Sequence, residues 1–242
     1  MPLKYKFIST DRSPLQIWEE PEKGCKYTIG CDAATGVGKD FTVFNVLSNR
    51  IPFVQVANYR AKCDTVEAAR VLNDLGWYYN KGMLVIETNY PGNAVQDIIL
   101  LTHKYPNVYR QEQHLDADPS VSDRFGIVTT ETSKWLLIGG LQEILKHDQL
   151  ILNCPQTIDE ILNFVYKEDK SKTGASEGMN DDEVMSLLMA VRGAKMYPQE
   201  PKPRRKKANK LSADLMQQKA IMKEFMNDYD RDRKNGRKVV IA

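Results

Sequence analysis

Residues 27–56 read YTIGCDAATGVGKDFTVFNVLSNRIPFVQV, and this stretch decides the fold. Its first segment alternates from Tyr27 to Cys31 and ends at Asp32, which is typical of a strand. Residues 41–47 and 51–56 are rich in β-branched and aromatic residues, and a Gly-rich stretch and Asn49-Arg50 separate the segments. Three short strands with short links predict an antiparallel meander.

The segments that follow predict helices alternating with strands. Apolar residues recur at helical spacing from about residue 65 to residue 79, after Asp64 or Thr65 as the cap. The continuous apolar run 83–86 suits a central strand buried on both faces. Further helices are expected over 91–101 and 132–147 and from about residues 155 and 180, and further strands from 108 and over 150–152. This order predicts an α/β fold, with an antiparallel three-strand meander, then parallel strands, and helices on both faces of the mixed sheet.

Charge divides the chain of 242 residues into unequal parts. We expect a lead-in or linker over 1–26, one compact domain over 27–198 and a basic tail over 199–242. From Lys202 onward, 13 Lys and Arg stand against 5 Asp and Glu, whereas the rest of the chain carries 21 against 27. The tail is expected to touch DNA or an acidic partner, or to order as a helix on a partner; a disordered, solubilising tail is the alternative.

Several function classes are excluded by what the sequence lacks. No apolar run reaches the roughly 18–20 residues of a membrane span, and the first residues lack the apolar segment of a signal peptide. The four cysteines form no C-x-x-C pair, so zinc-ligand spacing is absent, and Cys31 and Cys154 have the apolar neighbours of core residues. We expect a cytoplasmic protein that is neither secreted nor bound to a membrane.

Four acidic residues stand where strands or helices begin or end. Asp32 follows the first predicted strand, Glu87 follows the buried strand, and Asp181 and Asp182 begin the last helix. If the first and fourth strands are neighbours, Asp32 and Glu87 end side by side. Each acid also has a structural interpretation: Asp32 in a turn, Glu87 on a solvated rim, and the helix acids beside its dipole with Asn180 as the cap.

Carboxylates that are held together repel one another unless a cation neutralises them. Ligand sets made only of oxygen suit Mg²⁺ or Mn²⁺. Two such ions about 3.5–4 Å apart support in-line attack on a phosphodiester. The pattern therefore favours a two-ion site formed by Asp32, Glu87 and the acids that begin the last helix, and the periodicity does not decide between Asp181 and Asp182. The Gly38-Lys39-Asp40 fragment is not a nucleotide site, because Ala33 replaces the required glycine and Asp40 the Ser or Thr.

The order of these motifs resembles the nuclease domain of viral (tailed-bacteriophage) DNA-packaging terminase large subunits. The resemblance covers roughly residues 25–196. It is carried by the segments 29–40, IGCDAATGVGKD; 87–95, ETNYPGNAV; 125–134, FGIVTTETSK; 164–166, FVY; and 180–185, NDDEVM. Ala33 departs from the common proline, and Asn180 replaces the usual histidine.

The resemblance implies a ribonuclease-H-like fold and an endodeoxyribonuclease that cuts double-stranded, concatemeric viral DNA in the host cytoplasm. It implies metal-ligand roles for Asp32, Glu87 and Asp182, with Asp181 as a further ligand or supporting acid. The portal protein and the small terminase subunit are implied partners, and an ATPase domain, missing here, is expected in the full-length protein.

Phosphate contacts are expected from basic residues on predicted loops and at a helix start: Lys134, Arg124, Lys170 and Lys172. Solvated surface lysines are the alternative for all but Lys134. Two rival functions remain open. One is a junction resolvase or transposase-like nuclease of the same fold, and the other is a non-catalytic assembly module.

Overall fold

The computed structural model of the chain describes residues 13–111, 124–166, 173–175 and 180–199. The chain divides into two compact units, Met1–Glu200 and Pro201–Ala242, and the described residues all belong to the first. In those residues no helix combines the length and the apolar character needed to cross a membrane.

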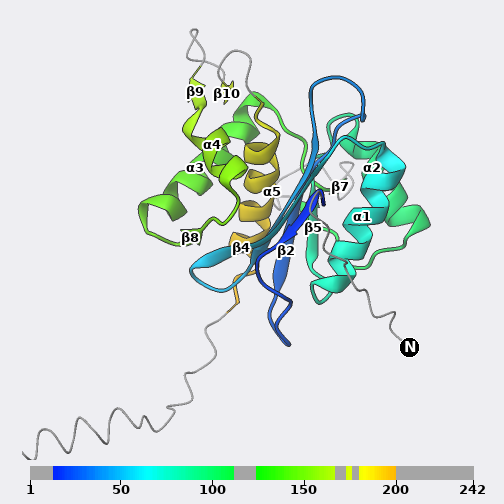
Figure 1. Cartoon of the computed structure of the whole chain (residues 1–242), viewed down its shortest axis with the longest axis horizontal. Coiled ribbons are helices and arrows are strands. Elements are labelled where there is room, and N and C mark those ends of the chain that lie inside the picture. Colours follow the sequence, from blue (N-terminus) through cyan, green and yellow to red (C-terminus); the bar gives the residue numbers. More distant parts are fainter. Residues whose placement is uncertain (1–12, 112–123, 167–172, 176–179, 200–242) are drawn as a thin grey trace, which may run out of the picture. The chain divides into compact units, whose positions relative to one another are not determined.

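A mixed sheet lies at the centre of the first unit (Figure 1). Its strands are β1 Leu15–Ile17, β2 Tyr27–Asp32, β3 Thr42–Ser48, β4 Phe53–Ala61, β5 Met83–Ile86 and β8 Leu150–Ile151. Two small two-stranded sheets are made by β6 Arg110–Gln111 with β7 Arg124–Phe125, and by β9 Phe164–Tyr166 with β10 Thr173–Ala175. The helices are α1 Thr65–Tyr78, α2 Gly92–Asp97, α3 Glu131–Lys146, α4 Pro155–Leu162, α5 Asp182–Met196 and the π-helix η1 Ile98–Thr102.

The strand order is β1-β4-β3-β2-β5, with β8 also paired to β4. The pairs β2–β3 and β3–β4 are antiparallel, so the predicted meander is confirmed. The pairs β2–β5 and β4–β8 are parallel, which confirms the parallel part of the sheet. The first and fourth predicted strands are therefore neighbours.

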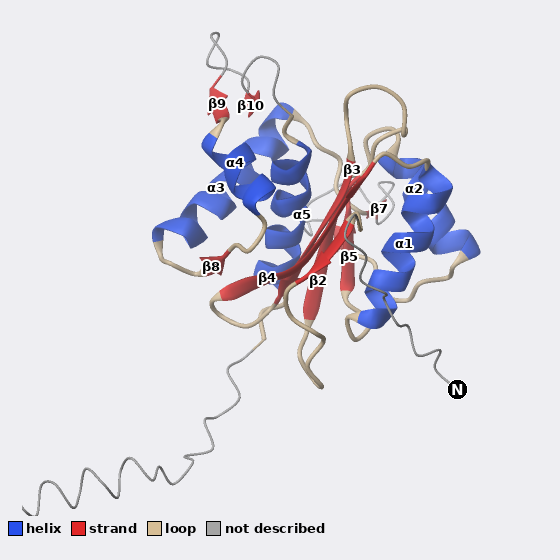
Figure 2. Cartoon of the chain, in the orientation of Figure 1, coloured by secondary structure: helices blue, strands red, loops and turns tan. Residues whose placement is uncertain are grey.

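Helices cover both faces of the sheet, as predicted (Figure 2). One buried cluster joins α1 to the sheet and the other joins α3 and α5 to it. Strand β5 contributes Leu84 and Ile86 to the first cluster and Met83 and Val85 to the second, which confirms a central strand buried on both faces. Cys31 and Cys154 are buried core side chains, as expected.

The sequence-based boundaries are wrong in three places. Residues 15–17, expected to belong to a lead-in, form β1 at the edge of the sheet, paired with β4. The third strand begins after Pro52, whose ring nitrogen cannot donate to the ladder, and continues to Ala61 through polar residues. The single helix expected over 91–101 is α2 followed by η1.

Helix α5 packs closely on β2. A side chain at Gly30 would place its Cβ 2.0 Å from the carbonyl oxygen of Ser186, so only glycine fits there. The Ser186 hydroxyl accepts a hydrogen bond from the Asn45 amide at 2.9 Å and donates one to the Gly30 carbonyl at 3.1 Å. The helix is buried along most of its length.

Candidate active site

The four predicted acids, from three separate segments, line one cleft together with Asp40. Asp32 ends β2 and Glu87 directly follows β5; the two meet because Cys31 and Ile86 are paired in the parallel ladder, and the Glu87 amide donates to the Cys31 carbonyl at 3.0 Å. Asp181 and Asp182 join them from the start of α5, in a cleft of about 380 Å³. The other lining residues are Ala33, Ala34, Thr35, Asp40, Phe41, Asn89, Tyr90 and Pro91.

The surroundings of Asp32 oppose its ionisation. Burial raises the pKa of Asp32 well above its usual range, and the nearby charges of Glu87, Asp182 and Asp181 raise it further. Asp32 and Glu87 share a hydrogen bond between their carboxyl groups. Burial also raises the pKa of Glu87, and the Lys134 ammonium opposes that rise. Positive charge that entered the cleft would favour the ionised forms of both acids.

The two acids of α5 are held in different ways. Asp182 is only 7% exposed, and its Oδ2 atom accepts from the Phe41 amide at 3.0 Å and from Asn180 Nδ2 at 3.1 Å. Burial raises the pKa of Asp182, and the hydrogen bond from Phe41 opposes the rise. Asp181 faces Lys134, whose Nζ atom lies 3.4 Å from Asp181 Oδ2.

The interpretation in which Asn180 caps the last helix is wrong. Asp181 occupies the N-cap position, and within the described part of the chain its side chain makes no capping hydrogen bond. Asn180 instead donates to Asp182 and, at 3.3 Å, to the Lys39 carbonyl. Its amide therefore ties the acidic helix start to the loop between β2 and β3.

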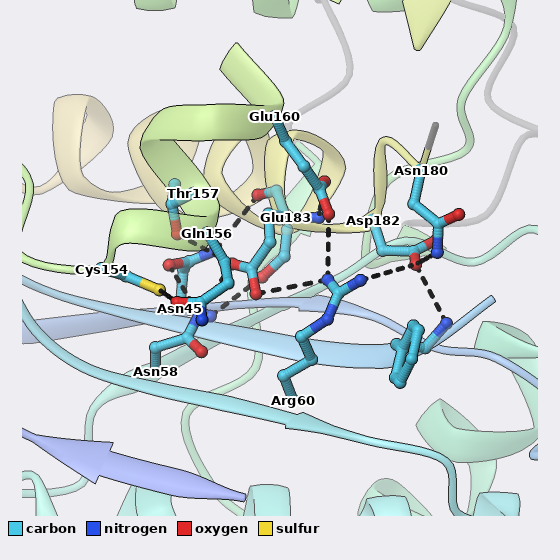
Figure 3. Close-up of polar contacts among 12 residues, drawn as sticks. Asn45, Asn58, Arg60, Cys154, Gln156, Thr157, Glu160, Asn180, Asp182 and Glu183 are labelled. Atoms are coloured by element: carbon cyan, nitrogen blue, oxygen red, sulfur yellow. Dashed lines mark hydrogen bonds and ion pairs between the residues drawn. The ribbon is translucent and has the colours of Figure 1, made fainter. Parts of the chain in front are cut away.

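A buried polar network lies behind the cleft, and sequence reasoning missed it (Figure 3). Glu183 is fully buried; it accepts from Asn58 Nδ2 at 2.7 Å and from the Thr157 hydroxyl at 2.8 Å, and burial raises its pKa. Its contacts satisfy a carboxylate that would otherwise be costly to bury. The available signal was a set of amide side chains inside otherwise apolar strands: Asn45, Gln55 and Asn58.

Arg60 of β4 connects this network to the cleft. Its guanidinium lies 3.0 Å from Glu160 Oε1, 3.4 Å from Glu183 Oε1 and 3.9 Å from Asp182 Oδ2 (Figure 3). It also lies over the ring of Phe41, 4.1 Å from the centroid. Burial raises the pKa of Glu160 to about 7. One arginine therefore faces three carboxylates, of which only Asp182 was a predicted metal ligand.

The donor set fits a divalent metal, although the side chains do not yet surround one. Among residues 13–111, 124–166, 173–175 and 180–199, no three Asp, Glu, His or Cys side chains lie in a geometry that would hold an ion. Asp32 and Glu87 bond to each other, and Asp181 turns to Lys134. Closely placed carboxylates that hold a proton or a lysine in this way are expected to turn toward a cation when one is bound. All the oxygens concerned are hard donors, the chemistry that suits Mg²⁺ or Mn²⁺.

The predicted phosphate-binding residues lie in different places. Lys134 is in the first turn of α3, 14% exposed, and pairs with Asp181 at the cleft. Arg124 is exposed on β7, outside the lining of the cleft. Lys170 and Lys172 lie outside the described residues.

Comparison with known proteins supports the fold. No protein-family model and no curated protein matches the sequence. The large terminase nuclease of thermophilic phage G20c with bound magnesium is similar in structure, with a TM-score of 0.60 and 21% identity over 76% of this chain and 89% of that one. The Thermus phage P74-26 large terminase nuclease domain has a TM-score of 0.55 and 20% identity over 75% and 86%. The G20c nuclease with bound zinc has a TM-score of 0.54 and 21% identity over 76% and 90%. The fold is that of these nuclease domains, as the sequence resemblance implied.

Proposed function

We propose that this chain is a metal-dependent endonuclease that cleaves double-stranded DNA, and that it serves as the nuclease of a phage DNA-packaging terminase, cutting concatemeric genomes. The observation that supports it most strongly is the convergence of Asp32, Glu87, Asp181 and Asp182 on one cleft. Structures with this fold include terminase nucleases with bound magnesium, cobalt and zinc.

Asp32, Glu87 and Asp182 would hold two Mg²⁺ or Mn²⁺ ions, with Asp181 as a further ligand. Bound ions of this kind lower the pKa of a water molecule and neutralise charge on a phosphodiester. Bound cations would favour the ionised forms of Asp32 and Glu87, whose pKa values are raised by burial. Lys134, once released from Asp181, would contact a phosphate of the substrate.

The chain's own contacts would orient these ligands. The Phe41 amide and Asn180 both bind the Oδ2 atom of Asp182, so the carboxylate is held on one side while its other oxygen can face the cleft. Gly92 allows the loop after β5 to fold back against the Glu87 backbone, since a Cβ on residue 92 would lie 1.8 Å from the Glu87 carbonyl oxygen. These contacts fix Asp182 and the loop after Glu87, while the side chains of Asp32, Glu87 and Asp181 would turn toward a bound cation.

The test is cleavage of supercoiled plasmid by the purified chain with Mg²⁺ or Mn²⁺, beside an EDTA control. Asp32→Asn keeps the shape of the side chain but removes its charge, and Asp97→Asn makes the same change on an exposed residue of α2. We expect nicking and linearisation by the wild type and by Asp97→Asn, and a loss of at least about a hundredfold in Asp32→Asn.

The other outcomes point to specific alternatives. Equal cleavage by wild type and Asp32→Asn would contradict the assignment of the site. Cleavage that requires four-way junctions would favour a resolvase-like nuclease. Absence of cleavage and of Mn²⁺ binding would favour the non-catalytic assembly module.

A further inference from the structure

The start of α5 is capped by a residue from another helix. The first amides of an α-helix lack partners within the helix, and the N-cap side chain usually accepts from one of them. Asp64 does this for α1, with hydrogen bonds from the amides of Val66 at 3.0 Å and Glu67 at 2.8 Å. Asp181 holds the same position in α5, yet among the described residues its side chain caps nothing and faces Lys134.

Glu160 of α4 supplies the missing acceptor. Its Oε2 atom accepts the hydrogen bond of the Glu183 amide at 2.8 Å, and Glu183 is the second residue of α5 (Figure 3). Its Oε1 atom lies 3.0 Å from Arg60, so both oxygens are engaged. The Glu160 side chain is 13% exposed, and Arg60 is fixed by the Phe41 ring as well. The Glu160 carboxylate, which belongs to α4, is therefore held in contact with the first turn of α5.

This arrangement separates two tasks that one aspartate cannot perform together. A carboxylate that caps its own helix points along the helix axis at the amides, whereas a metal ligand must point into the cleft. We propose that Glu160 is a positioning residue that caps α5 in place of Asp181 and so releases Asp181 to face the cleft. The assignment of Asp181 as a metal ligand rests on the proposed function. The capping of α5 by Glu160 instead of Asp181 (the exchange of caps) does not.

The exchange of caps is tested first, in EDTA, by urea unfolding of the wild type, Glu160→Ala, Asp181→Ala and the double variant. If Glu160 carries the cap, Asp181→Ala lowers the urea midpoint much less in the wild-type background than in Glu160→Ala, where Asp181 must take over the cap. Equal losses in the two backgrounds would overturn the proposal. The Asp181–Lys134 pair is lost only in the wild-type background, since Asp181 has already left Lys134 in Glu160→Ala, so its loss can only reduce the expected difference.

The positioning role is tested by Mn²⁺ affinity, measured by titration calorimetry without DNA. Glu160→Gln keeps an acceptor oxygen for the Glu183 amide but loses the charge that faces Arg60, whereas Glu160→Asp keeps the charge and withdraws it by one methylene. We expect Glu160→Gln to bind Mn²⁺ within about twofold of the wild type, and Glu160→Asp and Glu160→Ala to bind it about fivefold more weakly. The opposite order would assign Glu160 to the ion pair with Arg60 and overturn the proposal.

A matched control and a second combination complete the design. Glu67→Ala removes a carboxylate paired with Arg70 on α1, and we expect it to leave Mn²⁺ affinity unchanged. Adding Glu160→Ala to Asp181→Asn is expected to cause no further loss of affinity; additive losses would show that Glu160 does not act through Asp181 and would overturn the positioning role. If the wild type binds no Mn²⁺ while the exchange of caps is observed, the proposed function fails and the cap assignment stands.

Discussion

The carboxyl of Asp32 lies among groups that destabilise its charge. Burial and the charges of Glu87, Asp182 and Asp181 all raise its pKa. In the metal-free protein at pH 8, Asp32→Asn is therefore expected to raise the free energy of unfolding by about 1 kcal/mol, although cleavage is lost. Urea denaturation in EDTA measures this, with Asp97→Asn as the control. A lower free energy of unfolding for Asp32→Asn than for the wild type would show that the carboxylate stabilises the fold.

The same acids predict how the stability of the metal-free protein depends on pH. Burial raises the pKa of Glu160 to about 7 and raises those of Asp32 and Glu87 as well. A pKa that is higher in the folded state stabilises the fold at pH below the unfolded value, near 4, and this contribution is lost as pH rises through the folded value. The thermal midpoint in EDTA is therefore expected to fall between pH 5 and pH 8.

Mn²⁺ should reverse most of this decrease at pH 8, because a bound cation favours the ionised carboxylates. The check is a series of melting curves at pH 5, 6, 7 and 8, with and without the metal. A midpoint in EDTA that stays flat or rises with pH would contradict the burial of these acids.

Individual residues of the cleft were predictable from sequence to different degrees. Asp32 and Glu87 were predictable because the end of a strand is a local feature, and the parallel pairing of β2 with β5 brings them together. Sequence could not choose between Asp181 and Asp182, and the structure places both in the cleft. Glu160 was not predictable, because its role depends on how α4 packs beside α5, which no local pattern encodes.

Among the elements, α5 and β2 are in close contact at Gly30. Gly30→Ala would place a methyl group 2.0 Å from the Ser186 carbonyl oxygen, so the helix must shift. We expect a loss of about 2 kcal/mol in the free energy of unfolding, measured by urea denaturation.

Gly139→Ala is the matched control for this substitution. Gly139 lies within α3, and nothing stands within 4 Å of the position of an added Cβ. Alanine there should stabilise the protein by roughly 0.5–1 kcal/mol, since glycine is unfavourable inside a helix. If Gly30→Ala leaves the free energy of unfolding unchanged, α5 packs less tightly on β2 than these distances indicate.

Elements with strong local patterns were predictable, and those defined by pairing were not. The cap at Asp64 and the apolar spacing after it located α1, and the apolar run of β5 located the central strand. Strand β1 has three residues, none of them buried, so its existence depends on β4 alone. The C-terminal half of β4 was missed because Asn58 and Arg60 make contacts in the polar network and not in the apolar core.

At the scale of the whole molecule, charge separates the chain into two parts. The first compact unit ends at Glu200, and both core clusters lie between residues 25 and 194. Removing residues 202–242 takes away a net charge of +8 and leaves a chain with a net charge of −6. The thermal midpoint should therefore stay unchanged, whereas affinity for DNA should fall.

The measurement is the anisotropy of a labelled duplex at several salt concentrations, with Asp32→Asn in both chains to prevent cleavage. Each phosphate contact made by the tail contributes about 0.9 to the slope of log affinity against log salt, so the truncated chain should show a shallower slope. Plasmid cleavage at low salt by the truncated chain without Asp32→Asn checks that the cleft remains intact. If affinity and slope are both unchanged, the basic residues after Lys202 do not bind DNA, and the search turns to an acidic protein partner.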